Sequence, residues 1–299
     1  MKNHSRRPES PPMSRSQPSP PQRYSRMARR AASEVIGSYS TSFGAATQLL
    51  PEPQRTDIRN LYAVVRIADE IVDGAAPSPE RAATLDDYEQ RVRSAAAIEF
   101  HTDPILHAFA DTARRCSFDD AHLAAFFASM RHDVSGAVHT EESVEKYIYG
   151  SAEVVGLLCV DAFFGGRRPP HHEYAKLQEG ARALGAAFQK VNFLRDYADD
   201  TTRLARNYFP QARFPLRAED RDAIIADIQR DFDAAWSTIP ALPKRCGVAV
   251  AVAANLFEAL TDLLGDTPPT TIRAERVRVS AARKAAIIAR TAATGRRLR

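Results

Sequence analysis

Cysteine and glycine are both scarce in this sequence. Its 299 residues include only three cysteines and 13 glycines. Cys116, Cys159 and Cys246 are far apart, and no C-x-x-C pair predicts a zinc site or a redox couple. Isolated cysteines in odd number are typical of a reduced intracellular protein, where they act as small hydrophobic side chains. The scarcity of glycine, together with the lack of turn-punctuated alternating segments, argues against a β-sandwich or barrel.

Long uninterrupted hydrophobic runs are also absent. The N-terminus has no apolar signal-peptide core, so we expect the protein not to be secreted. The most apolar stretch, from Val248 to Leu264, is broken by Asn255, Glu258 and Asp262, which indicates a buried or amphipathic helix rather than a membrane span. These features predict a soluble, cytoplasmic protein and leave contact with a membrane surface open.

The composition favours an all-α fold. Hydrophobic residues make up 44% of the chain, enough for a sizeable core, and Ala and Leu are abundant. Residues 1–22 are rich in Pro, Ser and Arg, which predicts a disordered tail. We expect one helical domain over 23–290 and a basic tail over 291–299. The expected helices are 26–38, 53–73, 79–99, 104–116, 119–135, 140–164, 173–202, 218–237, 244–264 and 271–290.

Charge is distributed unevenly along the chain. Residues 1–30 carry a net charge of +7 and residues 271–299 carry +8, whereas the whole chain carries +4, so the middle is strongly acidic. A basic-tailed protein with an acidic body is one pattern of nucleic-acid binders. However, the sequence has no helix-turn-helix, zinc or RNA-binding signature, so we expect no nucleic-acid partner.

The first acidic motif lies in RTDIRNLYAVVRIADEIVDG, residues 55–74. On a helix, Tyr62, Arg66, Asp69 and Asp73 share one face, because they are separated by four, three and four residues. The rest of this helix is largely apolar. Two carboxylates one turn apart repel each other unless a cation lies between them, and Mg²⁺ prefers such hard oxygen ligands. The alternative is a solvated face on which Arg66 pairs with Asp69.

A second acidic motif lies in LGAAFQKVNFLRDYADDTTRLARNYFP, residues 184–210. Gln189, Asn192, Asp196 and either Asp199 or Asp200 recur at helical spacing. An amide and two carboxylates at 192, 196 and 200 form a compact set of oxygen ligands, with Arg195 and Arg206 near enough to meet an anion. Two such helices predict metal ions that grip a diphosphate from two sides.

Several motifs in a fixed order resemble the squalene/phytoene synthase family, whose members join two prenyl diphosphates head to head. SYSTSF (38–43) resembles its S-x-S-F element, and LYAVVRIADEIVD (61–73) its first aspartate motif. YIYGSAEVVGL (147–157) resembles its central tyrosine-glycine helix. QKVNFLRDYADD (189–200) and the following RNYFP resemble its second aspartate motif and its R-x-Y-L-P element. The resemblance spans about residues 39–210 and implies an isoprenoid-synthase-type helical bundle around a central cavity.

The resemblance also implies roles for individual residues. It assigns to Mg²⁺ the side chains of Asp69, Asp73, Asn192, Asp196 and Asp200. It assigns to the diphosphates Ser40, Ser42, Arg66, Arg195 and Arg206. It places around the reaction cavity Tyr62, Tyr147, Tyr208 and Gln189, and in the walls of the prenyl tunnels Val155 and Gly156. Among these, Arg66, Tyr147, Arg195 and Tyr208 are the expected catalytic residues.

The chain departs from the family pattern at a few positions. Tyr39 stands where His often precedes the S-x-S-F element, Phe209 replaces Leu in R-x-Y-L-P, and Glu153 replaces a small residue of the central helix. His132, in MRHDV, is expected to be a surface or packing residue. Simpler structural roles also exist for the site residues: the two serines of S-x-S-F can cap a helix, and the tyrosines of the central helix can belong to the core.

The resemblance implies a two-step reaction. Two geranylgeranyl diphosphates condense to a cyclopropylcarbinyl diphosphate, which rearranges to phytoene, a step of carotenoid biosynthesis. The nearest alternative is a C30 synthase that makes squalene, dehydrosqualene or hydroxysqualene from farnesyl diphosphate. A class I terpene cyclase of the same fold and a non-catalytic assembly protein are further alternatives. The S-x-S-F element argues against the cyclase, and the intact aspartate motifs argue against the assembly protein.

The expected cofactor is Mg²⁺, with three ions in each active site. NADPH is expected only if the squalene alternative holds, and no nicotinamide-binding motif is present. The expected partners are the prenyl diphosphates. A further hypothesis is that the basic tails favour an anionic membrane surface, where an apolar product would be delivered.

Overall fold

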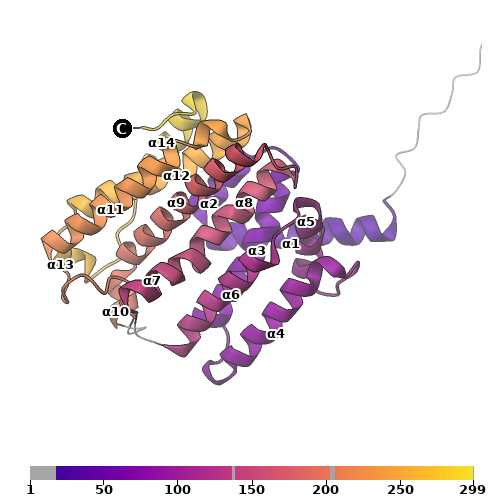
Figure 1. Ribbon diagram of the computed structural model, residues 1–299, viewed down its shortest axis with the longest axis horizontal. Helices are drawn as coiled ribbons and strands as arrows, with labels where there is room; N and C mark the ends of the chain where they lie inside the picture. Colours follow the sequence, from indigo (N-terminus) through magenta and orange to yellow (C-terminus); the bar gives the residue numbers. More distant parts are fainter. Residues whose placement is uncertain (1–17, 137–138, 203–205, 299) are drawn as a thin grey trace, which may run out of the picture.

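A computed structural model of the chain describes residues 18–136, 139–202 and 206–298. Within these residues it contains helices and no strand, which confirms the all-α prediction (Figure 1). The helices up to the central one are α1 (Pro20–Tyr39), α2 (Thr41–Gln48), α3 (Gln54–Asp73), α4 (Arg81–Ser94), α5 (Pro104–Cys116), α6 (Asp120–Ser135) and α7 (Glu141–Ile148). Those that follow are α8 (Val154–Phe164), α9 (His171–Arg195), α10 (Tyr197–Thr202), α11 (Ala218–Trp236), α12 (Lys244–Asp266), α13 (Pro269–Ile272) and α14 (Ala281–Thr294). Short 3₁₀ turns lie at Ser78–Glu80, Ala95–Ala97 and Ile239–Ala241.

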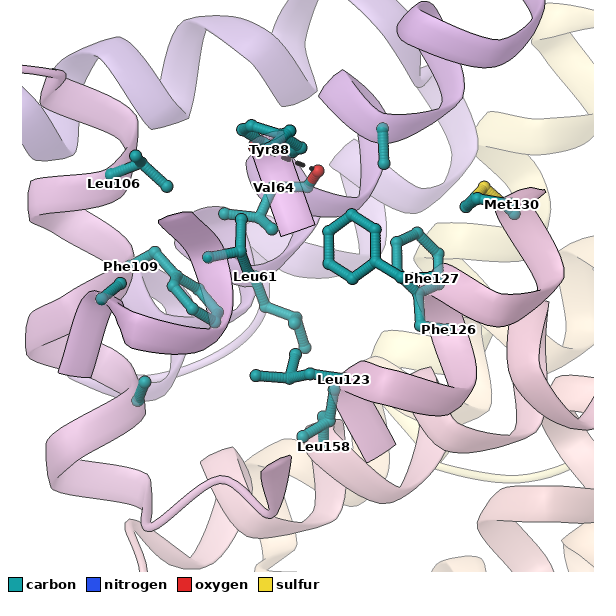
Figure 2. Packing of buried hydrophobic residues seen from close by; sticks show 14 of the residues in the cluster. Leu61, Val64, Tyr88, Leu106, Phe109, Leu123, Phe126, Phe127, Met130 and Leu158 are labelled. Atoms are coloured by element: carbon teal, nitrogen blue, oxygen red, sulfur yellow. Dashed lines mark hydrogen bonds between the residues drawn. The ribbon is translucent and has the colours of Figure 1, made fainter. Parts of the chain in front are cut away.

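Two large hydrophobic clusters hold most of the helices together, and five smaller ones pack others of the described residues. The first joins α3, α4, α5, α6 and α8, and Figure 2 shows Phe109 on one side of Leu61 and the paired rings of Phe126 and Phe127 on the other. The second joins α7, α9, α11 and α12 with the segment around Tyr208, and Phe232 at its centre is fully buried. In Figure 1, α3, α4, α5 and α6 lie toward the right and α9, α11 and α12 toward the upper left, with α7 and α8 between the two groups. The first acidic motif, on α3, is therefore anchored in the first cluster, and the second, at the end of α9, in the second cluster.

The central helix is interrupted and closely packed. A π-helical turn, Tyr149–Glu153, separates α7 from α8. Glycines allow its backbone to approach the neighbouring helix: a Cβ on Gly156 would lie 2.5 Å from the carbonyl oxygen of Ala181, and one on Gly185 would lie 2.7 Å from that of Ala152. Such separations exclude any side chain, so these glycines set the distance between the central helix and α9.

Several helix boundaries differ from those expected. Residues 41–48 form a separate helix, α2, because Ser40 caps it with its side-chain oxygen. The expected helix 173–202 is broken at Asp196, which has φ −96° and ψ 8°. The expected helix 271–290 is wrong, since α13 ends at Ile272 and α14 begins only at Ala281 after Ser280, which caps it.

The two expected tails differ in what the structure describes. Residues 1–17 lie outside the described residues, and α1 begins at Pro20, inside the expected N-terminal tail. At the other end, α14 continues to Thr294, and Arg297 forms ion pairs with Asp233 and Glu258. The guanidinium of Arg297 also lies over the ring of Trp236. These contacts anchor the C-terminal residues on α11 and α12, so this segment is packed against the helical body.

In the described part of the chain, two helical stretches are long and apolar enough to cross a membrane by length and composition alone, Glu141–Phe164 and Lys244–Asp266. Their most apolar windows are 56% and 67% buried inside the protein. Both stretches are core helices of the bundle, in agreement with the interpretation of residues 248–264 from the sequence.

Candidate active site

The first acidic motif lies on the C-terminal half of α3. Ile58, Leu61, Ala68 and Val72 bury one face of this helix, which leaves the face of Tyr62, Arg66, Asp69 and Asp73 only half-buried or exposed. Arg66 contacts Asp69 at 3.7 Å and forms a closer ion pair with Glu70. Its guanidinium lies 4.3 Å from the ring centroid of Tyr39. Arg66 therefore does pair with Asp69, but the charges of Asp73 and Asp133 also act on Asp69.

Desolvation raises the pKa of Asp69 to about 7, and the negative charges of Asp73 and Asp133 add to this against the opposing effect of Arg66. The side chain of Asp69 is nevertheless 37% exposed, so water and ions can reach its carboxylate. An accessible carboxylate that is reluctant to ionise is one that a bound cation would stabilise.

The second acidic motif lies at the break between α9 and α10. Asp196 donates its backbone N–H to the carbonyl of Asn192 at 2.9 Å, and Asp200 donates to that of Asp196 at 3.0 Å. The carboxylate of Asp196 contacts Arg195 at 2.5 Å and Arg276 at 2.8 Å. Desolvation, together with the charges of Asp196 and Asp73 and against the opposing effect of Arg206, raises the pKa of Asp200 to about 7. Asp199, by contrast, is exposed.

Arg206 joins the two motifs. Its guanidinium contacts the carboxylate of Asp73 at 2.8 Å, although the two residues are far apart in the sequence. The same side chain donates a hydrogen bond to the carbonyl of Asp133 at 3.1 Å. Burial alone would lower the pKa of Arg206, but the charges of Asp133 and Asp73 more than offset this. The backbone N–H of Arg206 donates to the carbonyl of Asp200 at 2.8 Å, and the charge of Asp73 acts on the carboxyl of Asp200, so the acids of α3 and of α9–α10 lie near one another.

Asp133 is a site residue that sequence reasoning missed. It lies near the end of α6 and is only 7% exposed. Its carboxylate accepts hydrogen bonds from the hydroxyls of Tyr147 at 2.6 Å and Tyr208 at 3.1 Å, and lies 3.7 Å from the guanidinium of Arg206. Desolvation raises the pKa of Asp133 to about 6. The signal that could have found it was the acid of MRHDV, which follows a largely apolar run of the same helix.

Aromatic rings pack closely around this carboxylate. Tyr208 stacks on Phe193 with 3.9 Å between ring centroids and lies 5.3 Å from Tyr147. The ring centroid of His139 lies 4.9 Å from that of Tyr208 and 4.3 Å from that of His132. The ring contact of His132 agrees with the packing role expected of it. Burial, followed by His132 and Arg206, lowers the pKa of His139 to about 4, so its ring is neutral at physiological pH. The hydroxyl of Tyr147 is buried against Asp133 and does not reach the surface.

The S-x-S-F element lies next to α3. Ser40 accepts a hydrogen bond from the N–H of Phe43 at 3.2 Å, so its capping role is confirmed. Phe43 stacks on Tyr62 with 5.6 Å between centroids. Thr41, between the two serines, accepts a hydrogen bond from Lys284 of α14 at 3.2 Å, and Ser42 is half-buried. The element thus brings a lysine and hydroxyl groups beside the α3 face.

The remaining predicted residues lie on α8 and α9. Gln189 and Asn192 are half-buried in the last turns of α9, before Asp196. Val155 is half-buried and packs against the first hydrophobic cluster, and Gly156 lies at the crossing with α9. Glu153, whose orientation the sequence left open, forms an ion pair with Arg182 at 2.6 Å.

Arg276 is a second residue that the sequence did not single out. It was expected inside a helix, but it lies in the segment between α13 and α14 and pairs with Asp196. With Arg66, Arg195 and Arg206, it makes four arginines that contact the acids of the two motifs or their neighbours. Such guanidinium groups can exchange a carboxylate for a diphosphate, which offers them the same bidentate geometry.

The donor set fits Mg²⁺ chemically. Its members are carboxylates and one amide, the hard oxygen ligands that this ion takes. Among residues 18–136, 139–202 and 206–298, no three carboxylate, imidazole or thiolate groups converge on one point. Mg²⁺ is usually held by one or two carboxylates and completed by water and substrate phosphates, so a pair on each motif is a sufficient protein contribution.

Comparison with known proteins identifies the family. A profile described as squalene/phytoene synthase matches residues 36–283, most of the chain. The chain belongs to the squalene/phytoene synthase family. It is 32% identical to phytoene synthase of Arthrospira platensis over 185 residues, 59% of each chain. It is 31% identical to 4,4'-diapophytoene synthase of Staphylococcus haemolyticus over 207 residues, 66% of each chain. The match thus spans about three fifths to two thirds of these relatives.

Solved structures of the squalene/phytoene synthase family have the same fold. A dehydrosqualene synthase crystallised with a ligand superimposes with a TM-score of 0.75 at 18% identity, covering 91% of this chain and 98% of that one. Squalene synthase HpnC from Alicyclobacillus acidocaldarius gives a TM-score of 0.69 at 21% identity, covering 82% of this chain and 96% of that one. This likeness confirms the predicted fold class.

Proposed function

We propose that the chain is a Mg²⁺-dependent prenyltransferase that condenses two geranylgeranyl diphosphates head to head into phytoene. The observation that carries this proposal is the meeting of the two acidic motifs across Arg206. Asp69 and Asp73 face Asp196 and Asp200 in a setting that raises the pKa of Asp69 and Asp200, and arginines surround them. An array of this kind suits a highly charged leaving group that must depart from an apolar chain.

The reaction would proceed in two half-steps. The C–O bond of one prenyl diphosphate breaks, and the allylic cation alkylates a double bond of the second molecule. Loss of a proton closes a cyclopropane ring and gives a cyclopropylcarbinyl diphosphate. Its own C–O bond then breaks, and rearrangement with a further proton loss gives the linear hydrocarbon. Each hydrocarbon therefore releases two diphosphates and two protons.

The residues of the site have distinct tasks in this scheme. Bound Mg²⁺ would supply positive charge opposite the developing diphosphate anion. Arg66, Arg195 and Arg206 would bind its oxygens, which requires each guanidinium to leave its present carboxylate. Tyr147 and Tyr208 would present aromatic rings to the carbocation, and their close packing with Phe193 would exclude water from it.

The substrate length is the finer part of the proposal. Phytoene synthases are among the similar proteins, which supports the C40 reaction. A diapophytoene synthase and, at 26% identity, the presqualene diphosphate synthase of Rhodopseudomonas palustris are also similar, so a C30 product is the second candidate. The test is to incubate the protein and Mg²⁺ with geranylgeranyl or farnesyl diphosphate, each with and without NADPH, and to identify hydrocarbons by mass spectrometry.

The outcomes of this assay separate the candidates. Phytoene from geranylgeranyl diphosphate without NADPH is the expected result. A C30 hydrocarbon from farnesyl diphosphate alone would move the assignment to the dehydrosqualene reaction, and a requirement for NADPH would move it to squalene. The absence of any product from either substrate would refute the enzymatic proposal.

We further propose a cytoplasmic location with peripheral contact to an anionic membrane. Exposed Arg23, Arg26, Arg29 and Arg30 on α1 support this contact, as does Met27 on the same helix, which is 42% exposed. Each basic residue near such a surface contributes about 1 kcal/mol of attraction. The basic residues of the expected N-terminal tail before residue 18 lie outside the described part of the chain.

A further inference from the structure

Asp133 is the most buried carboxylate at the site, and no role follows for it from the two aspartate motifs. Only 3% of its side chain is exposed, whereas the side chains of Asp69 and Asp73 keep 37% and 42%. Its two oxygens are used separately: Oδ2 accepts from Tyr147, and Oδ1 accepts from Tyr208 and faces Arg206. A group so enclosed by protein partners is poorly placed to bind an ion or a substrate itself.

The chemistry of this carboxylate fixes the direction of two hydroxyl groups. An ionised carboxylate accepts hydrogen bonds and donates none, whereas a phenol has a single proton to donate. Both phenolic protons therefore point at Asp133, and the lone pairs of both oxygens point away from it. Without the carboxylate, the two hydroxyls, with ring centroids 5.3 Å apart, could rotate independently.

The same carboxylate fixes the position of a cation. The guanidinium of Arg206 lies 3.7 Å from Oδ1, and it also donates to the backbone carbonyl of the same residue at 3.1 Å. These contacts to α6 leave another nitrogen of Arg206 directed at Asp73 of α3, 2.8 Å away. Asp133 thus places a guanidinium that bridges α6 and the first aspartate motif.

We propose that Asp133 is a positioning residue, which orients the hydroxyls of Tyr147 and Tyr208 and holds Arg206 between the two aspartate motifs. This inference rests on the proposed function. In the reaction, phenolic oxygens whose lone pairs are directed away from Asp133 stabilise positive charge on a prenyl chain beside them, whereas freely rotating hydroxyls would present a proton part of the time. The held guanidinium meets the diphosphate without first having to be ordered.

The first test replaces Asp133 by Asn, which keeps the shape but exchanges one acceptor oxygen for a donor amide. We expect kcat to fall about 10- to 100-fold, the usual cost of losing a group that orients site residues, while KM changes less than about threefold. The matched control is Asp120→Asn in the first turn of the same helix, where the acid is paired with Arg93 near the surface. The control should keep the kcat of the unaltered protein.

A second test distinguishes positioning from a purely structural role. If Asp133 acts through the phenols, Asp133→Asn should cost much less in a Tyr147→Phe/Tyr208→Phe background, because the hydroxyls that it orients are already gone. Equal losses of kcat in both backgrounds would overturn the proposal. Should Asp133→Asn fail to fold, the two Tyr→Phe changes still test it, since residues that share one carboxylate must show non-additive effects on kcat.

A third measurement does not depend on turnover. The protein is labelled with 3-fluorotyrosine, and the ¹⁹F signals of the two site tyrosines are assigned from the Tyr147→Phe and Tyr208→Phe variants. Both signals should shift in Asp133→Asn and stay in place in Asp120→Asn. Unshifted signals would refute the positioning role. If the unaltered protein converts no prenyl diphosphate, the proposed function fails, and the fluorine spectra still decide whether Asp133 orients the tyrosines.

Discussion

Binding of a divalent cation to this site should become tighter as pH rises from 6 to 8. The two motifs each contribute one carboxyl group, Asp69 and Asp200, whose pKa is raised to about 7 by desolvation and by neighbouring acids. A protonated carboxyl does not bind a hard cation, so each group must lose its proton before it becomes a ligand. The perturbation is therefore a change of pH across the range in which both groups titrate.

The magnitude follows from the two pKa values. A carboxyl group with a pKa of about 7 is ionised in roughly one molecule in eleven at pH 6 and in roughly ten of eleven at pH 8. The ionised fraction thus changes about 10-fold for one group and about 100-fold for two independent groups. Because Asp69 is 37% exposed, solvent screening reduces its share. We expect cation affinity to be about 10- to 100-fold weaker at pH 6 than at pH 8.

The assay uses Mn²⁺ as a spectroscopic substitute for Mg²⁺. Electron paramagnetic resonance of the free ion gives the dissociation constant at pH 6, 7 and 8. Asp200→Asn removes one titrating group and should weaken binding and flatten the pH dependence, whereas Asp199→Asn, on the exposed neighbour, should change neither. An affinity that does not vary between pH 6 and 8 would refute the account of these two carboxyls as cation ligands.

Other predictions concern packing, stability and location. Phe127→Ala, in the middle of the first hydrophobic cluster, should lower the free energy of unfolding by about 3–5 kcal/mol in chemical denaturation. Gly156→Val should destabilise the fold by at least about 1–3 kcal/mol, since its side chain would meet the backbone of α9; an unchanged unfolding midpoint would contradict the close packing. Because the pKa values of Asp69 and Asp200 lie above the 3.8 of an unfolded carboxyl, their protonation favours the folded state below about pH 4, and this contribution is lost as pH rises through about 7. At pH 8 the cation-free protein should accordingly become more stable when Asp69 or Asp200 is replaced by Asn. Scanning calorimetry at pH 8 would show this as a higher melting temperature. Deletion of residues 1–22 should weaken binding to vesicles containing anionic lipid, and unchanged sedimentation with them would discard the contribution of these 22 residues.

The two acidic faces could be predicted because their geometry is local. Tyr62, Arg66, Asp69 and Asp73 share a face through helical spacing alone, and the structure keeps them on one helix. The apolar positions of α3 are equally local, which is why its end at Asp73 was predicted correctly. At residues 41–48 the pattern was insufficient: a capping role for Ser40 was one of the alternatives, but no helix was predicted to follow it.

Asp133 and Arg276 could not be found in this way, because their roles depend on residues distant in the sequence. The partners of Asp133 are 14 residues away in Tyr147 and 75 away in Tyr208, and they meet only after α6, α7 and the R-x-Y-F-P segment have packed. Arg276 reaches Asp196 only because residues 273–280 are not helical, against the helical pattern of their sequence. Tertiary packing therefore supplies the part of the site that spacing does not encode.

The most direct test of the central claim is the ratio of diphosphate released to hydrocarbon formed. With Mg²⁺ and geranylgeranyl diphosphate, the protein should release two diphosphates for each C40 hydrocarbon, because both C–O bonds break in a head-to-head condensation. Asp69→Ala and Asp196→Ala should release none while they remain folded. One diphosphate for each hydrocarbon would indicate cyclisation of a single prenyl chain, and full activity in either variant would contradict the joint action of the two acidic motifs.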